Sequence, residues 1–117
     1  MTEFYAPSHN LQCEIDYLAG SGSGTSVFCL TLSPQASVTL KPDGTLTECT
    51  GVNCLANAGL NTPTLPYGTS VALGPSTCLS LTTGMRCTMT SGIGFVMASS
   101  GVTPIGNVTL SHTTSSG

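Results

Sequence analysis

The sequence has few charged side chains and no tryptophan. Seven of its 117 residues are charged, two basic and five acidic, which gives a net charge of −3. Charged residues make up 6% of the chain, against about 25% in ordinary soluble domains. A nucleic-acid-binding surface needs clustered Lys and Arg to neutralise phosphates, and the chain has only Lys41 and Arg86. This composition excludes nucleic acid as a partner, and electrostatic docking to anionic lipid with it.

Long apolar runs and helical periodicity are also missing. No stretch approaches the ~18 consecutive apolar residues of a membrane-spanning helix, so we expect no membrane insertion. No window of about eleven residues repeats apolar side chains at helical spacing without Gly or Pro, which predicts helix limited to single turns. The start, Met1-Thr2-Glu3-Phe4, lacks the basic and apolar regions of a secretory signal. We expect that a signal was removed, or that the protein leaves the cell another way, for example inside a virion released by lysis.

Short β-favouring runs separated by turn residues recur along the chain. They lie at residues 9–17, 27–32, 36–41, 45–49, 69–73, 78–81, 85–89, 94–98 and 105–111. Asp43-Gly44 and Thr82-Thr83-Gly84 are typical hairpin turns, because Gly accepts a positive φ. We expect a flexible Gly-Ser loop at 18–26 and the least regular structure at 49–66. The pattern predicts an all-β fold, a small disulfide-stabilised antiparallel β-sandwich or barrel built from hairpins.

The chain is long enough for one domain, which we place at residues 1–112, followed by a frayed tail at 113–117. Its six cysteines allow fifteen pairings, and the sequence alone selects none of them. The predicted hairpins favour nearest neighbours, which are Cys13 with Cys29, Cys49 with Cys54, and Cys78 with Cys87. The alternative is a zinc site, but the C-x₄-C spacing of Cys49 and Cys54 has no histidine nearby. We therefore expect three disulfides and no metal.

Catalytic candidates are few. His9 and His112 lie near opposite ends of the chain, and no nucleophile motif accompanies either. Glu14 and Asp16 share one face of a predicted strand, at a spacing that a glycosidase would permit. Their face is opposite the apolar one, so we expect them to be exposed rather than in a cleft. The single lysine, Lys41, is not in a phosphate-binding loop. We expect no enzyme activity and no cofactor.

Several short motifs resemble a known family. They are residues 65–70 (LPYGTS), Cys78, residues 84–88 (GMRCT), residues 92–96 (GIGFV) and the opening at 6–13 (APSHNLQC). Together they resemble a small cysteine-rich domain of unknown function found in actinobacterial secreted proteins and lipoproteins and in related phage proteins. The resemblance implies a disulfide-stabilised β-domain outside the reducing cytoplasm, and supplies no catalytic residues. The missing signal and lipobox favour the phage members.

These features predict a non-enzymatic structural or interaction module. We expect an accessory virion protein of an actinobacteriophage, either a capsid decoration or a minor tail component, whose partners are other protein subunits. Low charge gives little repulsion between copies, and Lys, which usually protects sheet edges, occurs once. The alternative is a secreted cell-envelope binding domain of an actinobacterium, extracellular or on the envelope, with possible glycan contact.

Overall fold

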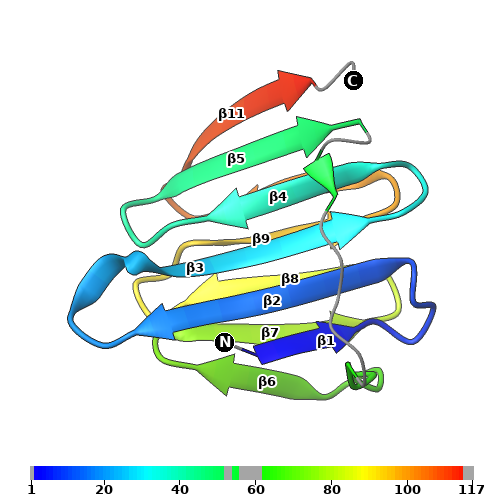
Figure 1. Ribbon diagram of the computed structural model, residues 1–117, viewed down its shortest axis with the longest axis horizontal. Helices are drawn as coiled ribbons and strands as arrows, with labels where there is room; N and C mark the ends of the chain where they lie inside the picture. The colour runs from blue at the N-terminus through cyan, green and yellow to red at the C-terminus, as the bar shows by residue number, and fades with distance from the viewer. Residues whose placement is uncertain (1, 52–53, 56–61, 115–117) are drawn as a thin grey trace.

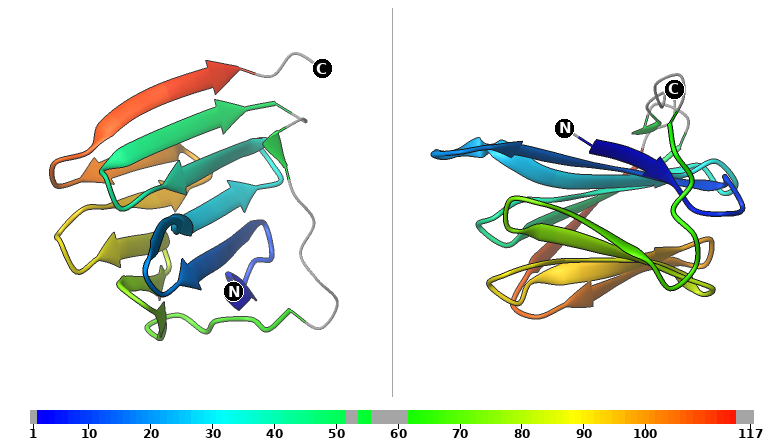
Figure 2. Two further views of the ribbon diagram at one scale, coloured as in Figure 1. Left: turned by 60° about the vertical axis from the view of Figure 1, so that its left-hand side comes forward. Right: turned by 90° about the horizontal axis from the view of Figure 1, so that it is seen from below.

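Two β-sheets packed face to face make up the fold. The computed structural model describes residues 2–51, 54–55 and 62–114. These residues form eleven strands and no α-helix, and Figures 1 and 2 show the strands in two layers. No helix in this part of the chain is long and apolar enough to cross a membrane. The predicted all-β fold is confirmed, and it is a sandwich of two open sheets rather than a closed barrel.

The larger sheet contains the N-terminal strands and the last strand of the chain. Its order is β1 (Thr2–Tyr5), β2 (Leu11–Leu18), β3 (Ser21–Thr31), β4 (Ala36–Leu40), β5 (Thr45–Thr50) and β11 (Thr109–Thr114). Neighbouring strands are antiparallel except β5 and β11, which are parallel. The hairpin between β4 and β5 turns at Gly44, whose φ is +91°, as the Asp-Gly pattern predicted.

The smaller sheet is a meander of consecutive antiparallel strands. Its order is β10 (Gly101–Ile105), β9 (Gly94–Ala98), β8 (Gly84–Met89), β7 (Ser76–Leu81) and β6 (Ser70–Leu73). The predicted Thr82-Thr83-Gly84 turn joins β7 to β8, with Leu81 opposite Gly84. β9 packs against β3 and β4 of the larger sheet, and β6 packs against β2. Both sheets therefore contribute a face to a single core.

The core forms because apolar side chains alternate along the strands. In β2, Leu11, Cys13 and Ile15 are buried, while the residues between them are only half-buried. The fully buried residues with large side chains include Val27, Val38, Leu40 and Leu46 from the larger sheet and Met85, Phe95 and Met97 from the smaller one. Aliphatic, methionine, phenylalanine and cystine side chains thus make up the core.

Two local predictions were wrong. Residues 21–26, predicted as part of a flexible loop, belong to β3, where Ser26 pairs with Asp16 and Ser21 with Leu18 across a bulge. Backbone pairing with β2 overrides the weak strand preference of this Gly-Ser sequence.

The strand predicted at 105–111 is in fact the end of one strand and the start of another. β10 ends at Ile105, and the chain turns at Gly106, whose φ is +73°, before β11 begins at Thr109 in the other sheet. β11 continues to Thr114, so Thr113, expected in a frayed tail, pairs with Cys49. Residues 115–117 of that tail lie outside the described residues.

The short strand β1 was not predicted. It pairs with β2 and, on its other side, contacts the segment that leads into the smaller sheet. The Tyr5 N–H donates to the Pro63 carbonyl at 2.8 Å, and the Leu65 N–H donates to the Tyr5 carbonyl at 2.8 Å. These bonds cover one end of the β1 edge. The region 49–66, predicted as the least regular, lies partly outside the described residues.

Candidate functional site

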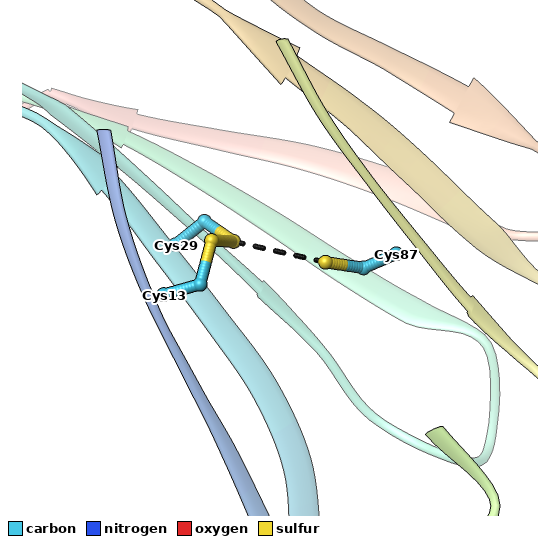
Figure 3. Close-up of side chains that lie close together, drawn as sticks. All are labelled: Cys13, Cys29 and Cys87. Atoms are coloured by element: carbon cyan, nitrogen blue, oxygen red, sulfur yellow. Dashed lines mark hydrogen bonds between the residues drawn. A yellow bond between two sulfur atoms is a disulfide. The ribbon is translucent and has the colours of Figure 1, made fainter. Parts of the chain in front are cut away.

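Two of the three disulfides lie against each other in the core. Cys13 is directly opposite Cys29 on β2 and β3, and Cys78 is directly opposite Cys87 on β7 and β8. All four side chains are at most 4% exposed. The Sγ atoms of Cys29 and Cys87 are 3.9 Å apart, and Figure 3 shows them facing each other. Both sulfurs are bonded to their partners and carry no proton, so this is a packing contact between the sheets.

The third disulfide, Cys49–Cys54, lies at the end of β5. Cys49 is half-buried and Cys54 is 8% exposed. All three predicted pairings are confirmed, and no cysteine is left unpaired.

The same geometry bears on the zinc alternative. Among the described residues, the sulfurs of Cys13, Cys29 and Cys87 lie within 4.8 Å of one another. Zinc is bound by deprotonated, unpaired thiolates, and each of these sulfurs is already bonded to another sulfur. The cluster is therefore structural in the oxidised protein.

Three of the five carboxylates gather on the outer face of the larger sheet. Glu3 lies opposite Glu14 across β1 and β2, and Asp16 is two residues further along β2. Partial burial, followed by the hydrogen bond and charge of Asp16 and the charge of Glu3, raises the pKa of Glu14 to about 7. The predicted placement of Glu14 and Asp16 on the face opposite buried Cys13 and Ile15 is confirmed, but both residues are half-buried rather than exposed as predicted. This geometry supports a proton shared between Glu14 and Asp16.

The two histidines lie on different parts of the larger sheet. His9, in the turn before β2 with a φ of +60°, stacks on Tyr5 with ring centroids 4.5 Å apart, and its Nε2 is 2.8 Å from Thr64 Oγ1. These two contacts hold the His9 ring against Tyr5 and Thr64, which is a structural role. His112 lies on β11 in register with Glu48 of β5. The structure does not bring the two histidines together.

A shallow cavity of about 170 Å³ opens at the end of the sandwich near the turn between β7 and β8. Its lining carries no ionisable group except the Tyr67 phenol; the polar residues are Ser8, Asn10, Thr31, Tyr67, Thr82, Thr83 and Ser99. Asn10 is already occupied, because its amide accepts from the Ser33 N–H at 2.9 Å and donates to the Ser33 carbonyl at 3.0 Å. The cavity therefore suits a neutral contact better than a charged ligand.

Among the strands of the larger sheet, β11 has an unbroken run of exposed residues in the part of the chain whose burial is described. Every residue from Thr109 to Thr113 is exposed, including Leu110 at 44%, so the smaller sheet does not cover this strand on either face. Figure 1 shows β11 at the margin of the larger sheet, where β5 is its one neighbour among the described strands. We call the side of β11 that faces away from β5 the open edge.

Sequence reasoning missed the open edge because the pattern placed a single strand at 105–111. The Gly106-Asn107 pair was a usable turn signal within that run. Parallel pairing with β5 has no local signal at all.

Comparison of the chain with protein-family models, curated proteins and solved structures found no match in any of the three.

Proposed function

We propose that this protein is a non-enzymatic structural module that works by contact with other protein subunits, as an accessory protein of a bacteriophage particle. The observation that carries the proposal is the open edge. A long exposed edge strand offers unpaired N–H and C=O groups to another chain, and proteins that act as monomers usually protect such edges. Strand addition at a sheet edge is a common way for two proteins to bind.

The composition supports the same function. With a net charge of −3 and seven charged residues in all, the surface presents neutral hydroxyl and amide groups that can approach another subunit without large desolvation of charge. Three disulfides in a chain of this size are typical of proteins that function in oxidising surroundings, which include virion surfaces. The resemblance of residues 65–70 and 84–88 to phage and actinobacterial domains points to the same setting.

Fractionation of an infected culture tests the proposal. An antibody raised against the purified protein should detect it in gradient-purified virions, in a fixed ratio to the major capsid or tail subunit. Detection only in the envelope fraction of uninfected cells would replace the virion function with the envelope-binding alternative. Detection only in the soluble cytoplasm, with reduced cysteines, would contradict both.

A second experiment tests the mode of action. Virions assembled with the His112→Pro variant, which lacks one N–H of the open edge, should carry less of the protein than virions assembled with His112→Ala. Equal incorporation of both variants would mean that the contact uses another surface.

A further inference from the structure

The two sheets have four edge strands, and three of them are protected. β1 is covered at Tyr5, which hydrogen-bonds to Pro63 and Leu65 on its outer side. β6 is only four residues long. β10 contains Pro104, which has no N–H to offer an added strand. Short strands and proline are both ways in which natural sheets avoid edge-to-edge association.

β11 has none of these protections. It is six residues long and contains neither proline nor a Lys, Arg, Asp or Glu side chain. No segment of residues 2–51, 54–55 and 62–114 pairs with the open edge. The contrast with the other three edges indicates that this one is kept available for a partner.

The hydrogen bonds to β5 show which groups of β11 point outward. The Thr109 N–H donates to the Gly44 carbonyl at 2.8 Å, so Thr109 faces β5. The N–H and C=O of one residue point to the same side of a strand, and successive residues alternate. Ser111 and Thr113 therefore also face β5. The residues that present their N–H and C=O to the open edge are Leu110, His112 and Thr114.

We propose that the open edge pairs antiparallel with the open edge of a second copy of this chain, about a two-fold axis through His112. The inference rests on the proposed function, because it names the partner of the contact surface described there. With His112 opposite His112 of the second copy, Leu110 falls opposite Thr114, and all three outward-facing residues meet outward-facing residues. About six hydrogen bonds form between the copies, as in a regular antiparallel ladder.

Self-pairing suits this strand for two further reasons. Its side chains are neutral apart from the titratable His112, so two copies bring no fixed like charges together. A two-fold axis perpendicular to the sheet also keeps equivalent faces on the same side. Leu110 and His112 share the face of Leu46, their neighbour on β5, and those faces then join into one continuous surface across both copies. The larger sheets of the two molecules become a single sheet.

The contact between the two copies buries little surface, so we expect the dimer only at high protein concentration. An interface of one six-residue strand is well below the ~1,200 Å² of a stable protein complex. We expect a weak dimer, with a dissociation constant on the order of 10⁻⁴ M, that becomes populated at the high local concentration of an assembly. Sedimentation equilibrium between about 10 μM and 1 mM should show the average mass rising from one chain toward two.

Matched variants test the geometry. His112→Pro removes an outward N–H without breaking a bond to β5, and should weaken dimerisation at least tenfold. His112→Ala keeps the N–H and should leave dimerisation within about twofold of the wild type. If His112→Pro fails to fold, Ser111→Lys/Thr113→Lys replaces it, because the added lysines of the two copies would then face one another across the two-fold axis.

Amide spectra locate the contact. As concentration rises, the amide signals of Leu110, His112 and Thr114 should shift and gain protection from exchange, while those of Thr109 and Ser111, already bonded to β5, should change little. A chain that stays monomeric at 1 mM, or a dimer that His112→Pro leaves intact, overturns the inference. If the isolated chain is monomeric but its incorporation into virions depends on the open edge, the proposed function stands and the partner is a different subunit.

Discussion

Removing a core disulfide should destabilise the protein much more than removing the peripheral one. Closing the loop between Cys13 and Cys29, which are 16 residues apart, lowers the entropy of the unfolded chain by an amount worth about 3 kcal/mol. The same calculation gives about 2 kcal/mol for Cys49 and Cys54, which are 5 residues apart. Loop closure alone therefore separates the two disulfides by only about 1 kcal/mol.

Packing adds a larger second contribution at the core site, because Cys49 is half-buried and Cys54, although only 8% exposed, lies outside the core cluster. Cys13 and Cys29 are at most 4% exposed, and the sulfur of Cys29 also contacts the sulfur of Cys87 in the other sheet. Replacing both cysteines with alanine removes two buried heavy atoms and leaves a cavity, which costs about 1–3 kcal/mol more. We expect Cys13→Ala/Cys29→Ala to lose about 4–6 kcal/mol, and Cys49→Ala/Cys54→Ala to lose about 2 kcal/mol.

Urea denaturation under non-reducing conditions measures the difference. With a slope of about 1.5 kcal/mol per molar urea, the midpoint should fall by about 3 M for the core variant and by about 1.3 M for the peripheral one. Free energies rather than midpoints decide the comparison, because an unfolded chain with one cross-link fewer exposes more surface and steepens the slope. A peripheral variant that loses as much stability as the core variant would refute the packing contribution.

Two further predictions follow from single residues. The raised pKa of Glu14 means that the folded chain holds the carboxyl proton more tightly than the unfolded chain does. The stability that this proton contributes is therefore lost as pH rises from 4.5 to about 7. Glu14→Gln should match the wild-type melting temperature at pH 4 and exceed it at pH 8, and a variant less stable than the wild type at pH 8 would contradict this. At Gly84, with a φ of +148°, an added Cβ would overlap the Met97 carbonyl, so Gly84→Ala should cost at least about 2 kcal/mol. Gly68→Ala, with a φ of +82° and open space around it, should cost only the backbone strain of about 1–2 kcal/mol. Thermal unfolding that shows equal losses at both glycines would argue against the close approach at Gly84.

The local parts of the fold could be predicted because local chemistry determines them. Alternating burial along β2 follows from Leu11, Cys13 and Ile15, and the turns at Gly44 and Gly84 follow from glycine at positions with positive φ. Two of the disulfides join directly opposite residues of a hairpin, Cys13 with Cys29 and Cys78 with Cys87, because such residues are close enough to be bridged. The third, Cys49–Cys54, follows from the short separation of 5 residues in the sequence.

The features that depend on distant segments could not be predicted. β11 pairs with β5, although all strands of the smaller sheet lie between them in the sequence. Nothing in the Thr109–Thr114 sequence specifies that partner or the parallel direction. The N-terminal half of β3 is ordered by β2 rather than by its own Gly-Ser sequence. The contact between Cys29 and Cys87 depends on how the sheets stack, which strand patterns leave open. The open edge is a product of the same non-local pairing.

The arrangement of the disulfides affects how the protein acquires them. Each pair closes within one hairpin or one short loop, so oxidation can be completed while the two sheets are still apart. Once the sheets dock, sulfurs of different pairs are 3.9 Å from each other, and a thiol of Cys29 left reduced would be within reach of the wrong disulfide. Correct connectivity is therefore safest when oxidation comes before docking. An export or assembly route that supplies oxidant early would give a homogeneous product, whereas late oxidation of a collapsed chain would produce sheets wrongly joined to each other.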